Sequence, residues 1–191
     1  MNKKLSDIAQ TANEIRHWSL LDQEHDDFVI GLEAASRHSG KNCAFIKSLA
    51  DDTSKEKTST ACGHLIQRCG IPGEFRSNRV RMTAWVRSAL SAESIGRLEL
   101  DVIGKWGWYC KWNGTYDNMS DRPIRGATDW QQYSLVVDVP EESISMYFGL
   151  SLIGSGKMWL DDLNFEVVDK TVSLTGLLDR PRNLDFSEKG Q

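Results

Sequence analysis

The sequence contains no apolar run long enough to cross a membrane or to form the core of a secretory signal. No stretch approaches the ~18 consecutive apolar residues that a membrane helix needs. The first ten residues carry Lys3 and Lys4 but are not followed by an apolar segment of signal-peptide length. We therefore expect a soluble, cytoplasmic protein with no membrane partner.

An excess of positive charge is also lacking. The chain has 23 Lys and Arg residues against 27 Asp and Glu residues, a net charge of -4 and a pI near 5.6. A nucleic-acid surface needs clustered Lys and Arg to neutralise phosphates, whereas the clusters here are short and of mixed sign. The charge distribution argues against a nucleic-acid partner.

The cysteines and histidines show no metal-ligand spacing. The four cysteines match neither a Cys-x-x-Cys metal site nor a dense secreted disulfide framework. A Cys62–Cys69 bridge would require the residues between them to turn back, whereas these residues have the pattern of one strand. We predict buried free thiols. No combination of His, Ser and Cys along the sequence indicates a nucleophilic site.

Alternation of apolar and polar residues recurs along the chain and indicates β-strands with one buried face. In the segment 79–87, the polar face consists of Arg81, Thr83, Trp85 and Arg87. The segments 97–103 and 144–152 repeat the pattern, with polar faces that include Glu99, Asp101 and Tyr147.

The whole chain has about nine or ten short strand patterns separated by turn residues, which is typical of an all-β sandwich. A length of 191 residues with 40% hydrophobic content fits one domain. We divide the chain into an N-terminal extension (1–27), a β-sandwich (28–170) and a C-terminal tail (171–191). Apolar residues at helical spacing in 5–16 predict a short helix or a loose lead-in within the extension.

Residues 104–130 hold four of the seven Trp residues and have the character of a long loop between strands. Such a loop is longer than a connector needs to be, and loops on a rigid scaffold commonly carry function. Its flat rings, which suit stacking on a sugar, are Trp106, Trp108, Tyr109, Trp112 and Tyr116. Alternatively, these rings plug one end of the sandwich while Gly, Pro and Asp shape the turns.

The segment 117–130, Asp-Asn-Met-Ser-Asp-Arg-Pro-Ile-Arg-Gly-Ala-Thr-Asp-Trp, resembles a signature of a galactose-binding-like jelly-roll family. Residues 79–87 resemble that family's R-V-R-x-x-A-x-V-R strand, and 148–150 with 154–163 resemble its closing strands. The similarity covers about residues 28–186. It implies a jelly-roll β-sandwich of the kind that serves as an accessory domain in bacterial arabinose-type transcription regulators and in some hydrolases. Since such folds host many unrelated sites, the similarity does not define one function.

The resemblance also bears on metal binding and on the tail. Asp161 lies where many jelly-roll modules hold a structural calcium ion, a metal that prefers carboxylate and carbonyl oxygens. The family's Asn-x-Gly-Phe-Glu opening, which supplies a partner ligand, is missing here, so the alternative is that Asp161 caps a turn or pairs with Lys157. No other cofactor is expected. The segment 181–187 resembles the opening of a following module in longer relatives.

If the polar faces of these strands are neighbours, their side chains converge on one concave surface beneath the aromatic loop. The predicted ligand-binding residues are Gln67, Arg81, Trp85, Arg87, Glu99, Asp101, Trp106, Trp108, Tyr109 and Tyr147. Rings for stacking, combined with hydrogen-bonding groups, suit a sugar or another small polar ligand. A structural alternative is that Arg81 and Arg87 neutralise Glu99 and Asp101 across strands.

These features predict a non-catalytic module that binds a carbohydrate or a similar small molecule, as a sensor or accessory domain. The runner-up is a small-molecule cyclase or isomerase on the same scaffold, in which Glu99 or Asp101 moves a proton. A third interpretation is a protein-interaction domain whose exposed Trp residues meet a partner chain or a second copy in a homodimer.

Overall fold

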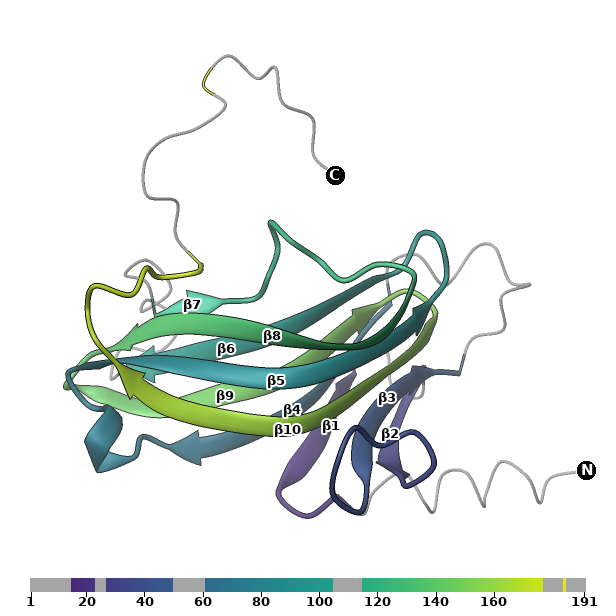
Figure 1. Ribbon diagram of the computed structural model, residues 1–191, viewed down its shortest axis with the longest axis horizontal. Coiled ribbons are helices and arrows are strands. Elements are labelled where there is room, and N and C mark those ends of the chain that lie inside the picture. The colour runs from purple at the N-terminus through teal and green to yellow at the C-terminus, as the bar shows by residue number, and fades with distance from the viewer. Residues whose placement is uncertain (1–14, 23–26, 50–60, 105–114, 177–183, 185–191) are drawn as a thin grey trace, which may run out of the picture.

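The computed structural model describes residues 15–22, 27–49, 61–104, 115–176 and 184. In these ranges the chain forms two five-stranded antiparallel sheets stacked face to face, with one short 3-10 turn at Gly73–Phe75 (Figure 1). This confirms the predicted jelly-roll β-sandwich.

The strands are divided between two sheets, which we call sheet A and sheet B. Sheet A has the spatial order β1 (Trp18–Asp22), β4 (Cys62–Gly70), β9 (Ser143–Ile153), β6 (Ile95–Gly104) and β7 (Tyr116–Asp117). Sheet B has the order β2 (Phe28–Glu33), β3 (Cys43–Ser48), β10 (Gly156–Val168), β5 (Asn78–Leu90) and β8 (Ala127–Val139). From β3 to β6, and again from β7 to β10, consecutive strands alternate between the sheets.

The apolar faces of the two sheets meet in one core. The inward residues of β5 and β6 are fully buried, namely Val80, Met82, Ala84, Val86, Leu98, Leu100 and Val102. These are the residues that the alternation assigns to the buried face, because successive side chains of a strand point to opposite sides. The predicted facing of both strands is therefore confirmed.

The segment 104–130 is not a single loop. It contains the short strand β7, and β8 already begins at Ala127. The four rings Trp106, Trp108, Tyr109 and Trp112 lie outside the described residues.

The segments before and after the predicted sandwich (1–27 and 171–191) both make contacts with its strands. Strand β1 falls within residues 1–27 and pairs with β4 at the edge of sheet A. Residues 5–14 of the predicted helical segment lie outside the described residues. In the tail, the Thr175 backbone N–H donates to the Val136 carbonyl at 3.1 Å, and the Val136 N–H donates to Thr175 Oγ1 at 2.7 Å. Thr175 therefore bonds to strand β8 at the edge of sheet B. The described part of the chain contains no helix with the length and apolarity of a membrane span.

A buried carboxylate organises the segment after β7. The Asp117 side chain is 2% exposed, and it accepts hydrogen bonds from the Met119 backbone N–H (2.9 Å) and from the Arg122 guanidinium. Arg122 also donates to Asp121 at 2.7 Å and to the Thr175 carbonyl at 3.2 Å. The pair thus fixes a turn that buries Met119 and connects it to the tail.

We expect Asp117→Ala to lower the free energy of unfolding by about 2 kcal/mol, because it leaves the buried Met119 N–H and the partly buried Arg122 guanidinium without their acceptor. Asp121→Ala removes a 63% exposed partner of the same Arg122 and should cost less than about 0.5 kcal/mol. Urea unfolding of both variants measures the difference. Equal losses would show that Asp117 has no special structural role.

Candidate functional site

The outer face of sheet A carries side chains in rows that cross its strands. Strand register places Arg68, Tyr147, Asp101 and Tyr116 in one row. A parallel row consists of Leu21, His64, Ser151 and Arg97. Between them lies a row whose central position, on β9, is Gly149.

Gly149 creates a depression in the middle of this face, because it has no side chain. Its φ is +153°, and an added Cβ would lie 1.9 Å from the Leu65 carbonyl oxygen. The backbone here therefore requires glycine. With no side chain at Gly149 and a small one at Ser151, residues on β4 and β6 can meet over β9.

We predict that Gly149→Ala lowers the free energy of unfolding by about 3 kcal/mol, because both the backbone conformation and the contact with Leu65 are incompatible with a Cβ. At Gly70, on another strand of sheet A, an added Cβ would meet nothing within 4 Å. Gly70→Ala should change the stability by less than about 0.5 kcal/mol. Chemical denaturation of both variants tests the comparison, and a Gly149→Ala protein as stable as the Gly70→Ala control would contradict it.

The rows enclose a pocket of about 330 Å³ on the outer face of sheet A. Its lining includes Tyr147, Asp101, Tyr116 and Asn118 at one end and Leu21, Ile153 and Cys62 toward the other, with Ile66 in the middle row. His64, Glu99 and Arg97 also line it. The pocket thus combines a polar, aromatic end with an apolar end.

A hydrogen-bonded chain of three titratable groups crosses the pocket. His64 Nδ1 lies 2.6 Å from Glu99 Oε1, and His64 Nε2 lies 3.3 Å from Cys62 Sγ. The hydrogen bonds to Cys62 and Glu99 raise the pKa of His64 to about 10, while burial opposes the shift. At neutral pH the imidazole is therefore charged, and both of its ring N–H groups donate.

The raised pKa of His64 predicts a pH-dependent stability. A group whose pKa is higher in the folded state stabilises the fold fully below its unfolded pKa, which is about 6.5 for histidine. The contribution is lost as the pH rises toward about 10. We expect the stability difference between the wild type and Glu99→Gln to be larger at pH 6 than at pH 9.5, as measured by urea unfolding. His38→Gln, which alters the histidine paired with Asp162 on the other sheet, is the control. A Glu99→Gln difference that stays constant or grows between pH 6 and pH 9.5 would contradict the assignment.

The pocket lining presents polar groups that suit hydroxyl-rich ligands. Arg97 Nε is buried and has no hydrogen-bond partner among the described residues. Burial, followed by the charges of Glu99 and Asp101, raises the pKa of Tyr116, so its hydroxyl stays protonated. The Arg68 guanidinium covers the Tyr147 ring at 5.2 Å. The pocket therefore offers aromatic surface, hydrogen-bond donors and hydrogen-bond acceptors in its lining.

The structure brings together only part of the predicted site. Glu99, Asp101 and Tyr147 line the pocket as expected. Gln67 does not, because it shares its side of β4 with the fully buried Leu65. Trp106, Trp108 and Tyr109 lie outside the described residues.

The expected convergence of Arg81, Trp85 and Arg87 on the same surface is wrong. All three are on β5, which belongs to sheet B, so they point away from the pocket on the opposite side of the sandwich. For the same reason, Arg81 and Arg87 do not neutralise Glu99 and Asp101. Arg81 instead pairs with Glu166 at 2.9 Å, and Arg87 lies over the Trp159 ring at 5.1 Å.

The outer face of sheet B is occupied by contacts among its own residues. His38 stacks on Trp85 with ring centroids 4.0 Å apart, and its Nδ1 lies 2.7 Å from Asp162. Glu33 accepts hydrogen bonds from Lys157 and Trp159. The bond from Lys157, the largest cause, lowers the pKa of Glu33 to about 2.

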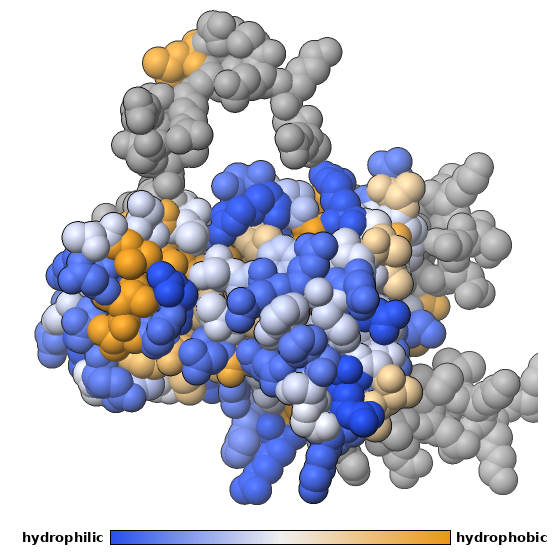
Figure 2. Space-filling view, in the orientation of Figure 1, coloured by the Kyte–Doolittle hydropathy of each residue, from blue (hydrophilic) through white to orange (hydrophobic). Residues whose placement is uncertain are grey.

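Figure 2 shows this face of the molecule, over β5, β8 and β10, as mostly hydrophilic with apolar residues gathered toward one end. The pocket is on the side turned away from the viewer.

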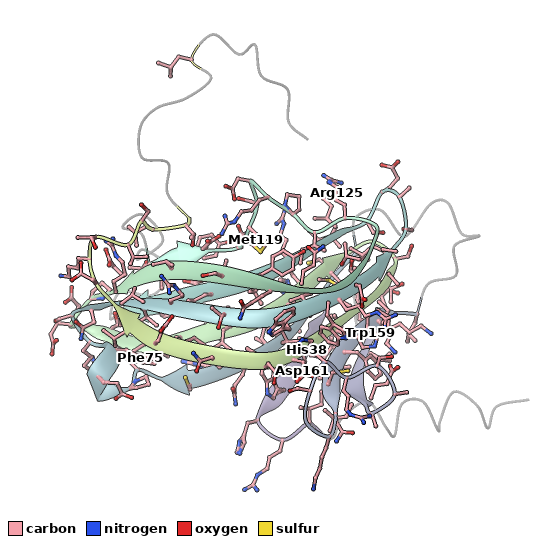
Figure 3. All side chains as sticks on the ribbon, in the orientation of Figure 1. His38, Phe75, Met119, Arg125, Trp159 and Asp161 are labelled. Atoms are coloured by element: carbon pink, nitrogen blue, oxygen red, sulfur yellow. The ribbon has the colours of Figure 1, made fainter. Side chains whose placement is uncertain are left out.

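Asp161 has the contacts of a turn cap. Its Oδ2 accepts the backbone N–H groups of His38 (2.9 Å) and Ser39 (3.1 Å), and its Oδ1 accepts that of Asp162 (2.9 Å). Figure 3 shows Asp161 beside His38. A calcium ligand would have to turn its oxygens from these donors toward a cation. Within the described ranges, no group of three or more His, Cys, Asp or Glu residues could hold a metal ion. These contacts match the turn-capping alternative, and the Lys157 partner is Glu33 rather than Asp161.

Sequence reasoning missed Cys62, His64 and Arg97 as site residues. Cys62 and His64 are two apart on one strand, so they share a face, and Arg97 shares a face with Glu99. The alternation could have identified them. The expectation that no His and Cys combination forms a site overlooked this spacing. The cysteines Cys43, Cys62 and Cys69 are free, and a Cys62–Cys69 bridge is ruled out because β4 is extended between them.

No family model matches the sequence. A curated relative, the uncharacterized HTH-type transcriptional regulator YbfP of Bacillus subtilis (strain 168), is 31% identical over 191 residues. The alignment covers 93% of this chain and 59% of the regulator, so the chain spans about three fifths of the length of the relative.

Solved structures with a similar fold include carbohydrate-binding modules. The C-terminal family 22 module of Clostridium thermocellum Xyn10B has a TM-score of 0.52 and 11% identity, over 83% of this chain and 90% of the module. TmCBM61, solved in complex with β-1,4-galactotriose, has a TM-score of 0.51 and 10% identity, over 83% of this chain and 93% of that one. At these identities the likeness shows the fold alone.

Proposed function

We propose that the pocket on the outer face of sheet A binds a carbohydrate without chemical change. The observation that carries the proposal is the polar lining of the pocket. Tyr147 and Tyr116 flank Asp101 in one row, and Arg97 Nε, in the row of His64, lacks a protein acceptor among the described residues. Aromatic rings give a sugar a stacking surface, and a few placed polar groups fix its orientation.

Two comparisons support this reading. Solved structures with this fold include a module in complex with β-1,4-galactotriose and the CBM22-1 and GH10 modules of a xylanase together in complex with xylohexaose. The relative YbfP is an HTH-type regulator of which this chain matches the larger part. We infer a sensor role, in which sugar binding to this domain is communicated to a DNA-binding part of a longer regulator.

Calorimetric titration with xylo- and galacto-oligosaccharides tests the proposal. We expect binding by at least one member of the panel, and a loss of at least about tenfold in affinity for Tyr147→Ala and Arg97→Ala, equivalent to about 1.4 kcal/mol. Arg81→Ala is the matched control, because it removes an outward arginine from the other sheet. Its affinity should stay within about twofold of the wild type.

Two outcomes would count against the proposal. One is an absence of binding across a broad panel of sugars by a folded protein. The other is an equal loss in Arg81→Ala and Arg97→Ala, which would move the site away from sheet A or make the effect one of stability.

The enzymatic alternative gains one observation. Glu99, the proton-moving group of this alternative, lies in the pocket at 2.6 Å from a histidine that holds a proton at neutral pH. The pair could pass a proton to a bound molecule. An isomerisation that depends on both Glu99 and His64 would favour the enzyme over the binding module.

A further inference from the structure

The Cys62 thiol is held in the arrangement that activates nucleophilic cysteines. Cys62 and His64 lie on the same face of β4, and Glu99 reaches His64 from β6 across the low middle of β9. The imidazole contacts the sulfur at 3.3 Å through Nε2 and the carboxylate at 2.6 Å through Nδ1. Hydrogen bonds thus connect a nucleophile (Cys62) to a base (His64) and the base to a group that orients it (Glu99).

The charge of His64 acts on the sulfur. Because Glu99 accepts the Nδ1 proton, the ring is oriented with its Nε2–H directed at Cys62. A charged imidazole beside a cysteine favours the thiolate, which is the reactive form. The carboxylate therefore acts on the thiol through the imidazole.

The other described cysteines have different surroundings. Cys43 is buried and donates to the Glu33 carbonyl at 3.3 Å, and burial raises its pKa. Burial also raises the pKa of Cys69. Cys62 is partly exposed and lines the pocket. Among these three thiols, Cys62 is the one placed to react with a bound molecule.

The walls of the pocket near Cys62 indicate what kind of molecule could bind there and react with the thiol. Leu21 and Ile153 line this end, and register places Ile153 directly beside Cys62. Apolar walls suit a hydrocarbon skeleton better than sugar hydroxyls. Arg97, in the same pocket, offers a cation to a carbonyl oxygen.

We propose that Cys62 is a nucleophilic site that adds reversibly to a small apolar α,β-unsaturated carbonyl compound bound in the pocket. The thiolate forms a bond to the β-carbon, and the π electrons of the C=C bond move toward the carbonyl oxygen, where Arg97 stabilises the negative charge. His64 Nε2 then returns the proton to the α-carbon. The net reaction adds the sulfur and its proton across the double bond, so no oxidant, reductant or further reactant is needed. This reaction does not depend on sugar binding.

The test uses 2-cyclohexen-1-one as the probe and the complete chain at pH 6.5, with each cysteine followed by peptide mass spectrometry. An ordinary thiol is about 1% thiolate at this pH. A histidine beside a cysteine favours the thiolate, and the weaker nucleophilicity of a more acidic thiol offsets part of that gain. We expect Cys62 to react about fivefold faster than free cysteine and faster than Cys69 in the same sample.

Variants test whether the hydrogen bonds among Cys62, His64 and Glu99, rather than exposure of the thiol alone, determine the rate at Cys62. His64→Ala should lower the Cys62 rate about fivefold while leaving Cys69 unchanged, and Glu99→Gln should lower it by a smaller factor. His38→Ala, in the β2–β3 connection that packs on Trp85 of the other sheet, is the matched control and should have no effect. Cys62→Ser should form no adduct at position 62.

The proposal is overturned if Cys62 reacts no faster than Cys69 in the folded wild type, or if His64→Ala leaves the Cys62 rate unchanged. Should His64→Ala fail to fold by circular dichroism, the wild-type comparison and Glu99→Gln still decide. Sugar binding that persists in Cys62→Ser would leave the carbohydrate proposal intact whatever the thiol does.

Discussion

The pocket depends on the backbone of β9 at Gly149. This strand runs between β4 and β6 in sheet A. The φ of Gly149 is +153°, and the nearby Leu65 carbonyl leaves no room for a Cβ at this residue. Neighbouring strands lie about 4.8 Å apart, so β4 and β6 are separated by about twice that distance. His64 Nδ1 and Glu99 Oε1 meet across this gap at 2.6 Å because Gly149 has no side chain to separate them. The glycine that the backbone requires therefore creates the hollow and allows the His64–Glu99 hydrogen bond. This bond, together with the hydrogen bond to Cys62, raises the pKa of His64.

The two outer faces of the sandwich carry similar residues in different arrangements. Both carry arginines, carboxylates, aromatic rings and a histidine. On sheet B these groups pair with one another, as Arg81 does with Glu166 and His38 does with Trp85 and Asp162. On sheet A, Arg97 faces a pocket with its Nε unpaired within the described residues. A polar outward face is thus not enough to indicate a site, because what matters is whether the side chains have satisfied one another.

Alternation along single strands predicted the fold and the buried faces well. The facing of β5 and β6 follows from a local rule, since side chains alternate whatever the partner strand is. Which strands share a sheet is a non-local property, and there the prediction that Arg81 and Glu99 converge was wrong. A jelly roll sends consecutive strands to opposite sheets, as β5 and β6 show. Applied to the sequence, that rule would have separated Arg81 from Glu99 and drawn attention to His64 on the same sheet as Glu99.

The segment that most resembles a known family signature is partly structural. Asp117 and Arg122 form a partly buried pair, Met119 and Ile124 belong to the core, and the backbone of Ile124 exchanges hydrogen bonds of 2.8 and 2.9 Å with Gly96. These contacts hold the segment against β6, the strand that carries Arg97, Glu99 and Asp101. The contribution of the signature to function is therefore indirect for most of its residues. It positions β7 and Tyr116 at the rim of the pocket, and Asn118 is the signature residue whose contact with the pocket is direct. Such a motif can persist among proteins that bind different ligands, because the fold needs it and the chemistry of the pocket lies on other strands.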